Sequence, residues 1–392
     1  MRALFWFWGT LLLGLASGAG ALQALGPPIE RMAEGAAKGA VRTAMVEKPR
    51  APGDAAAGHE AAAPAKAAPT EQPLRAQMRE VASGVWPSGV PRPSGAVSAP
   101  DAALQEPSAA FPGAMLPRIG ADHRRPSQAY AAAFNHADRR PRIAILLGGY
   151  AMSEMDSMEA ATALPAAVSF AVSPYAHRAD RLLEAARLAG HELLVEIPME
   201  PLGFPLNDAG DRALLTGLPP AQNQERLEWA LSRFTGYVGA TNALDGMRGE
   251  RLAASVQLAA VLHDLSERGL LFVDAAASLP APLPERGALP YEGRPVDVVI
   301  DDPAVRPEIE ARLAQLEGIA HDRGAALGLA GLPRPVTVGR IAAWAATLGS
   351  RGFVLVPVTA VQETPLGTPL AQGEGLGQVS SATSSASSSE SQ

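Results

Sequence analysis

Four acidic residues are the side chains of this 392-residue chain that are best placed to do chemistry. Each lies at or just after the end of a short apolar run, and an asparagine follows another such run; the set is Glu196, Glu200, Asn242, Asp274 and Asp301. Carboxylate oxygens could hold a hard cation such as Ca²⁺ or Mg²⁺, and two carboxyl groups about 5–9 Å apart could hydrolyse a glycosidic bond. The alternative is that these acids hydrogen-bond loop backbone and shape the opening of the fold.

Other catalytic groups form no recognisable pattern. The chain has no cysteine, which excludes disulfides, thiolate zinc sites and cysteine nucleophiles. No Gly-x-Ser-x-Gly elbow is present. The seven histidines lack the spacings typical of metal sites. For each of them we expect a surface or locally hydrogen-bonded role: His59, His123, His136, His177, His191, His263 and His321.

The elements that must position the acids lie between about residues 137 and 362. Here short apolar runs alternate with amphipathic stretches, and the runs are continuous, as in strands buried on both faces of a parallel sheet. The expected strands are 143–147, 167–172, 193–197, 237–241, 270–274, 296–300, 326–329 and 353–358. The expected helices are 177–189, 220–234, 251–268, 303–323 and 336–348. This order predicts a parallel α/β architecture, either a doubly wound sheet or a β/α barrel, with function at the carboxyl ends of the strands.

The flanking segments have a different composition. Arg2 precedes an apolar run, so residues 1–22 are expected to be a signal peptide or a membrane anchor. Residues 23–136 are rich in Ala and Pro and are expected to be a disordered tether, and residues 363–392 a disordered Ser-rich tail. The protein should therefore be exported, and either periplasmic or anchored to the inner membrane by its N-terminal segment.

Charge limits the partners. The net charge is −7 and the sequence pI is about 5.6, which argues against nucleic acid, because phosphate binding needs a basic surface. We expect contact with a membrane only through the N-terminal segment. A glycan or another envelope protein remains as the expected partner.

Several stretches of the 137–362 segment resemble, in the same order, the divergent polysaccharide deacetylase family. Residues 141–147 are similar to its first strand, residues 168–176 to its second strand and Pro-Tyr-Ala turn, and residues 189–201 to the segment with Pro-Met-Glu-Pro at 198–201. The resemblance implies a distorted β/α barrel. It also implies a divalent metal, held by one Asp and two His, that lowers the pKa of a bound water, with a carboxylate as the base.

The metal-binding positions of that family are occupied here by residues without ligand atoms. Gly148 and Gly149 stand where the family has Asp-Asp, while Ala243 and Leu332 stand at its two histidine positions. We therefore expect no metal cofactor; the ancestral divalent ion, zinc in such enzymes, should be lost. Tyr150, directly after the glycines, could stack on a sugar or pack in the core.

Three functions remain open at this stage. The first is a catalytically degenerate envelope protein that acts as a glycan-binding, scaffold or regulatory module. The second is a hydrolase, of deacetylase or glycosidase type, that uses the remaining carboxylates. The third is a tethered protein-binding domain. Oxygens that converge on one point would favour the second function, whereas a mouth filled by Met199, Leu244 and Leu332 would favour the first.

Overall fold

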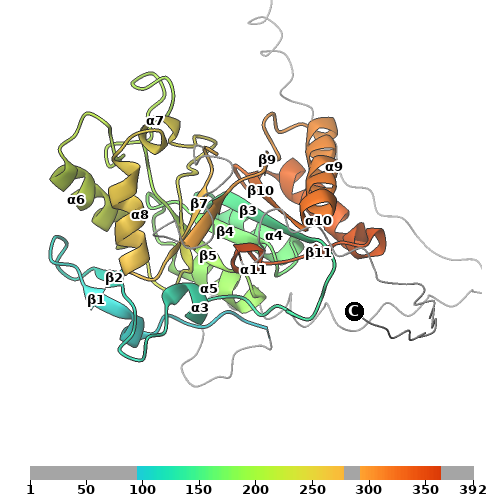
Figure 1. Ribbon diagram of the computed structural model, residues 1–392, viewed down its shortest axis with the longest axis horizontal. Helices are drawn as coiled ribbons and strands as arrows, with labels where there is room; N and C mark the ends of the chain where they lie inside the picture. The colour runs from blue at the N-terminus through green and yellow to red at the C-terminus, as the bar shows by residue number, and fades with distance from the viewer. Residues whose placement is uncertain (1–94, 278–291, 363–392) are drawn as a thin grey trace, which may run out of the picture. The chain divides into compact units, whose positions relative to one another are not determined.

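The computed structural model describes residues 95–277 and 292–362. Its main feature is a nine-stranded sheet in which every pairing is parallel and which curls into a half-barrel flanked by helices (Figure 1). The order along the sheet is β8 (Glu292–Pro295), β7 (Leu271–Asp274), β6 (Gly239–Thr241), β5 (Leu193–Glu196), β4 (Ser169–Val172), β3 (Arg142–Tyr150), β10 (Ala325–Ala330) and β9 (Val298–Val299), while β11 (Val354–Leu355) pairs with the start of β3. The predicted α/β barrel is confirmed.

Helices follow most strands and cover the outside of the sheet. They are α4 (Glu154–Ala163), α5 (Asp180–Ala189), α6 (Pro220–Leu231), α7 (Glu250–Ala253), α8 (Leu258–Glu267), α9 (Arg306–Arg323), α10 (Pro335–Leu348) with the 3₁₀ turn η3 (Gly349–Arg351), and α11 (Val358–Gln362). Prolines at the first helical position start α6 and α10, where the missing N–H costs no hydrogen bond. Gly190 and Gly324 end α5 and α9 in the left-handed conformation, with φ of 91° and 81°.

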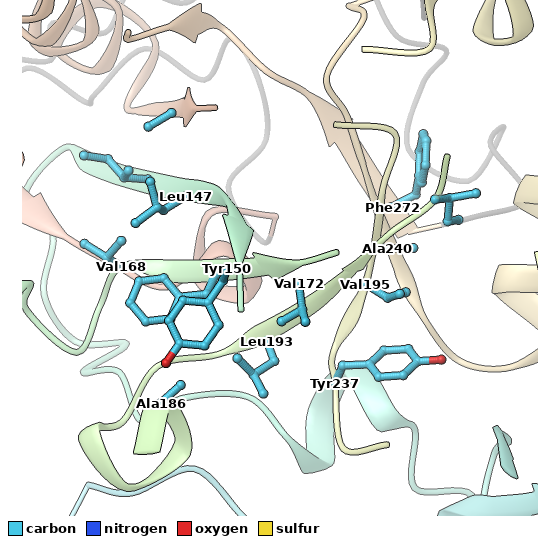
Figure 2. Packing of buried hydrophobic residues seen from close by; sticks show 14 of the residues in the cluster. Leu147, Tyr150, Val168, Val172, Ala186, Leu193, Val195, Tyr237, Ala240 and Phe272 are labelled. Atoms are coloured by element: carbon cyan, nitrogen blue, oxygen red, sulfur yellow. The ribbon is translucent and has the colours of Figure 1, made fainter. Parts of the chain in front are cut away.

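Alternate side chains of β3 divide the core into two clusters. Ile143, Ile145 and Leu147 pack with the helices, whereas Ala144 and Leu146 join the cluster inside the half-barrel. Figure 2 shows part of the helix-side cluster, which includes Tyr150.

Tyr150 is a core residue. Its ring stacks on Phe170 with centroids 4.5 Å apart, and its hydroxyl donates to the Leu182 carbonyl at 2.9 Å. The side chain is completely buried, so the idea that it stacks on a sugar was wrong.

Residues 95–136 correct the expectation of a disordered tether. They form η2 (Ala102–Leu104), the antiparallel pair β1 (Gln105–Pro107) and β2 (Met115–Pro117), and α3 (Pro126–Ala129). Large apolar residues are sparse in this arm, but Val97, Leu104 and Tyr130 are buried in the inner cluster, so a few anchors suffice to order it. The expectations for residues 1–22, 23–94 and 363–392 concern parts of the chain outside the described residues. Within the described ranges, no helix has the length and apolar character needed to cross a bilayer.

One buried carboxylate joins the arm to the last helix at the amino end of β5. Glu192 accepts hydrogen bonds from the N–H of Ala132 at 3.0 Å, the hydroxyl of Ser169 at 3.1 Å and the N–H of Thr359 at 3.2 Å, and it also contacts the Thr359 hydroxyl. Burial raises the pKa of Glu192, and these hydrogen bonds oppose the shift. The arm and α11 are thus both hydrogen-bonded to the residue that precedes β5, at the amino end of that strand.

Candidate functional site

The carboxyl end of β3 is where the barrel opens. The register between β3 and β4 shifts between Leu147 and Tyr150, so Gly148 and Gly149 form a bulge. Gly149 has a φ of 64°, which an L side chain rarely adopts. A Cβ atom on Gly148 would stand 2.9 Å from both Glu196 Oε1 and the Gly331 carbonyl oxygen, and one on Gly149 would clash with Leu332 Cδ2. The space that side chains at these positions need is already filled.

Glu196, the last residue of β5, lies completely buried beside this bulge. Its Oε1 atom accepts a hydrogen bond from the Gly149 N–H at 2.7 Å, while Oε2 has no hydrogen-bond partner within the described part of the chain. Burial raises the pKa of Glu196 well above its ordinary value; the Gly149 N–H opposes this shift and the charge of Asp245 adds to it. The fold therefore favours the neutral acid.

Asp245 lies at the tip of a small hairpin that follows β6. Leu244 and Met247 exchange two backbone hydrogen bonds, and Asp245 and Gly246 between them have φ of 49° and 86°. Positive φ at both central residues is typical of a two-residue hairpin turn with the Asp-Gly sequence. The Cα of Gly246 is 3.5 Å from the point where a Cβ on Gly331 would stand, so the tip covers the end of β10. Neighbouring atoms desolvate the Asp245 carboxyl and raise its pKa, although the residue is exposed as a whole.

Glu200 holds loops together. Its Oε2 accepts from the N–H of Thr216 at 2.5 Å and from the hydroxyl of the same residue at 2.7 Å, and Oε1 pairs with Arg251 at 3.0 Å. Its backbone carbonyl also accepts from the N–H groups of Arg251 and Leu252 in α7. A carboxylate with these partners fixes the connections after β5 and β6.

Asn242 and Asp274 contact each other at the ends of β6 and β7. Asn242 Nδ2 donates to Asp274 Oδ1 at 3.2 Å and to the Arg248 carbonyl at 2.9 Å, and Asn242 Oδ1 accepts from the N–H of Ala275 at 2.7 Å. Asp274 Oδ1 also accepts from the Ala276 N–H at 3.0 Å. The pair fixes the ends of two neighbouring strands.

Asp301 follows β9 and is bound to the β10–α10 connection. Its Oδ1 accepts from the Gly331 N–H at 2.7 Å and its Oδ2 from the Thr337 hydroxyl at 3.1 Å, with Arg334 at 3.8 Å. The five residues predicted as the pocket thus lie around the mouth. Asn242 and Asp274 are hydrogen-bonded to each other, and Glu196 has an oxygen that no described residue binds.

Apolar side chains lie at or beside the other positions that are expected to have lost ligands. Ala243, Leu244 and Met199 are buried, with 4%, 2% and 1% of their surface exposed, and Leu332 is half-buried against Gly149. Among the described residues there is no group of three or more His, Asp or Glu side chains that could hold a metal ion. His191 lies at the opposite end of β5, fully buried, with Nδ1 2.7 Å from the Val168 carbonyl; burial lowers its pKa to about 4.

Sequence reasoning named Glu196 but left Asp245 out of the predicted pocket. The Asp-Gly pair between Leu244 and Met247 was the signal that could have placed Asp245 at a hairpin tip, since this dipeptide is typical of two-residue turns. The influence of Asp245 on Glu196 comes from the fold and has no sequence signature.

Comparison with known families places this geometry in context. Residues 145–362, more than half of the chain, match the family described as divergent polysaccharide deacetylase. The chain belongs to the divergent polysaccharide deacetylase family. Within this family's fold, the positions where the sequence resemblance places an Asp-Asp pair and two histidines hold Gly148, Gly149, Ala243 and Leu332, none of which offers a side-chain donor atom. The residues present therefore do not fit the family's metal.

Two solved structures resemble this member of the family. One is an uncharacterized protein of Agrobacterium tumefaciens C58, with 33% identity, a TM-score of 0.58, and coverage of 63% of this chain and 99% of that chain. The other is a proposed cellobiose-phosphate cleavage protein of Enterococcus faecalis V583, with 12% identity, a TM-score of 0.39, and coverage of 56% of this chain and 98% of that chain. The second similarity is too weak to carry an argument. No curated protein matches the chain.

Proposed function

We propose that this divergent deacetylase domain is a carbohydrate-associated module of the cell envelope that binds a glycan or serves as a scaffold, and does not deacetylate by metal catalysis. The observation that supports the proposal is the filled space at the two glycines that stand where the resemblance places the Asp-Asp pair: Leu332 occupies the space beside Gly149, and Glu196 with the Gly331 carbonyl occupies the space beside Gly148. A metal-activated water needs ligand atoms and room at this place.

The remaining acids support the same proposal. Glu200, Asp274 and Asp301 accept hydrogen bonds from backbone N–H groups of the loops around the mouth. Moving any of them to a shared cation would leave those buried donors without acceptors, at about 1–3 kcal/mol each. Their positions are explained by these hydrogen bonds, which fix the loops around the mouth of the barrel.

A second candidate function rests on Glu196. A buried carboxylic acid with a raised pKa and an unused oxygen is the form in which a general acid donates a proton to a leaving group. Asp245 would be the second carboxyl group of such a glycosidase-like site. Glu196 is completely buried, so this function would require the atoms that cover it to move away before a glycan could reach it.

The experiment is metal analysis of the purified full-length protein, combined with acetate release from acetylated chitin oligomers and peptidoglycan. We expect zinc far below one equivalent and no acetate. Zinc near one equivalent together with released acetate would refute the proposal. Reducing-end release that disappears in Glu196→Gln would instead support the second candidate, while binding of the same oligomers without turnover, measured by calorimetry, would support the first.

Envelope location is part of the proposal and rests on the sequence. Arg2 followed by an apolar run resembles an export signal. Cell fractionation of the full-length protein, with a variant that lacks residues 1–22 as the control, tests it. Recovery of both forms in the cytoplasm would contradict an envelope role.

A further inference from the structure

The connection between β6 and α7 crosses the mouth of the barrel. The Cα atom of Gly246, at the tip of its hairpin, lies 3.5 Å from the point where a Cβ on Gly331 would stand. Gly331 directly follows β10, and the strands β5, β4 and β3 separate β6 from β10 in the sheet. Residues 243–249, here called the strap, therefore reach from one side of the mouth to the other.

The strap is held on its two sides by contacts of different strength. Leu244, which is 2% exposed, packs against Ala209 and Ala213 of the β5–α6 connection. On the far side, Arg248 Nη1 lies 3.7 Å from Oδ2 of Asp302, beyond the end of β9. The Asp302 side chain is 69% exposed, and ion pairs in contact with water contribute little to stability. Of these two contacts, the buried one at Leu244 is therefore the stronger.

The tip of the strap is not hydrogen-bonded to the rest of the described chain. The two backbone bonds of the hairpin run between Leu244 and Met247, inside the strap, and Asp245 and Gly246 make none outside it. At the base, Gly249 has a φ of 58°, in the region that favours glycine. A residue at the end of a surface segment can absorb the backbone change of a hinge. Lifting the tip therefore breaks no hydrogen bond within the described ranges.

Glu196 lies in the part of the mouth that the strap tip reaches. Its Oε1 atom and the Gly331 carbonyl oxygen are both 2.9 Å from the point where a Cβ on Gly148 would stand. The residue next to the strap tip is thus also a neighbour of the acid. Burial raises the pKa of Glu196 and the charge of Asp245 adds to the shift, so the tip is within electrostatic reach of the carboxyl group.

The second oxygen of Glu196 is a reason for the mouth to open. Oε2 is buried and has no hydrogen-bond partner among the described residues. A buried polar atom without a partner destabilises a fold, and a ligand that bonds to it removes that cost. A ligand can reach Oε2 only if neighbouring atoms move, and the strap tip is a neighbour with no hydrogen bond to lose.

We propose that the strap is a lid over a ligand site built on Glu196. It lifts as a unit about Gly249, so that Leu244 leaves its contacts with the β5–α6 connection and the tip leaves Gly331. The closed form is the major state, and the open form is a minor state that ligand binding selects. The ligand that it admits is the glycan of the proposed function, on which this inference rests.

Cysteine accessibility in the full-length protein measures the opening. The chain has no cysteine, so a single introduced thiol reports its own exposure. Glu196→Cys tests the site beside the strap tip, and Val238→Cys tests a completely buried position just before β6, at the other end of that strand. With each rate divided by that of the same variant in urea, iodoacetamide should react with Glu196→Cys at least about tenfold faster. Equal rates would mean that both thiols are reached only when the whole domain unfolds, and would overturn the proposal.

Two equally buried leucines separate the opening of the strap from unfolding. Leu244 and Leu348, which lies in α10, are each 2% exposed, so Leu→Ala leaves a cavity at either position. Leu244→Ala should raise the rate at Glu196→Cys by at least about tenfold, because the lid loses its buried attachment. Leu348→Ala should raise the rate at Val238→Cys but not at Glu196→Cys, since Leu348 stays packed when the strap lifts. An equal rise at both thiols with Leu348→Ala would overturn the proposal.

Hydrogen exchange makes the same measurement without a change at position 196. The Gly149 N–H donates to Glu196 Oε1, and the Val238 N–H donates to the Leu193 carbonyl. After correction for intrinsic rates, Gly149 should exchange faster than Val238 in the native protein, and Leu244→Ala should accelerate its exchange. Equal protection of the two groups would overturn the strap, whatever the protein binds. If the strap opens but chitin oligomers leave the exchange of Gly149 unchanged, the result would support the strap and refute the glycan-binding function.

Discussion

Leu332 and Gly149 fit each other at the mouth of the barrel: the Leu332 side chain fills the space that a side chain at position 149 would need. By the sequence resemblance, the two positions are expected to correspond to a histidine and an aspartate of the family. Gly149 and Leu332 are therefore complementary in shape, and the effect of a substitution at one position on stability should depend on the residue at the other.

Gly149→Ala tests this complementarity. The φ of 64° and the clash with Leu332 should together lower the free energy of unfolding by about 2–4 kcal/mol. In a Leu332→Ala background the clash is absent and only the cost of the positive φ remains. The loss of unfolding free energy caused by Gly149→Ala should therefore be smaller by about 1–2 kcal/mol. Urea unfolding of the double-mutant cycle measures the coupling. Gly217→Ala, at a position with open space, is the matched control and should change stability by less than about 0.5 kcal/mol. Strict additivity of the two changes would contradict the fit.

Glu196→Gln should change how stability depends on pH. The pKa of Glu196 is higher in the folded protein than the ordinary 4.5, so the folded state holds a proton that the unfolded state releases. The contribution of the neutral Glu196 side chain to the free energy of unfolding is fully present below pH 4.5. It is lost as pH rises from there through the pKa of the folded protein, by about 1.4 kcal/mol per pH unit. Relative to the native protein, the variant should gain stability as pH rises above 4.5. Urea unfolding between about pH 5 and pH 8 measures the difference in free energy of unfolding between the variant and the native protein. A difference that does not change with pH would contradict the raised pKa of Glu196.

His191 contributes a pH dependence of opposite sign. Burial lowers its pKa from 6.5 to about 4, so the unfolded chain binds the proton more readily. This contribution to stability is present above pH 6.5 and is lost as pH falls towards 4. His191→Gln should flatten the acid side of the stability curve, and Glu196→Gln should not. Thermal unfolding in matched buffers distinguishes the two, and an unchanged acid limb in His191→Gln would contradict the neutral buried imidazole.

The arm of residues 95–136 should be required for a stable domain. Chains that begin at residue 137 lose the buried anchors Val97, Leu104 and Tyr130 and leave their cavity in the half-barrel open. Each such side chain contributes about 1.5–3 kcal/mol, so the loss approaches the total stability of an ordinary domain. Calorimetry of chains that begin at 95 and at 137 tests this; equal midpoints would show that the arm is dispensable.

Much of this fold could be predicted from the sequence, because the strands of a parallel sheet are buried on both faces and read as continuous apolar runs. The runs at 143–147, 193–197 and 270–274 fall on β3, β5 and β7. The arm was missed because its order depends on a few anchors that fill the barrel, which local composition cannot reveal. Tyr150 was uncertain because a residue after a glycine pair can point to either side of a bulge.

The candidate site was only partly predictable for a related reason. The identities of Gly148, Gly149, Ala243 and Leu332 predicted that ligand atoms are missing, but not that the space beside the two glycines is filled. The roles of Glu200 and Asp301 as acceptors for backbone groups depend on loops that meet only in three dimensions. Acidic residues at strand ends have the same sequence pattern whether they act on a substrate or accept hydrogen bonds from the loops around the mouth.

The contacts of Glu192 have a consequence for how the protein is made. Its carboxylate receives hydrogen bonds from Ala132, near the start of the domain, and from Thr359, near its end. A nascent chain that has emerged only as far as β10 still lacks the Thr359 N–H and hydroxyl, so each oxygen of the Glu192 carboxylate has one partner fewer than in the complete domain. Completion of the domain should therefore wait until the last helix has left the ribosome, which makes stalled or prematurely ended chains easy targets for proteases.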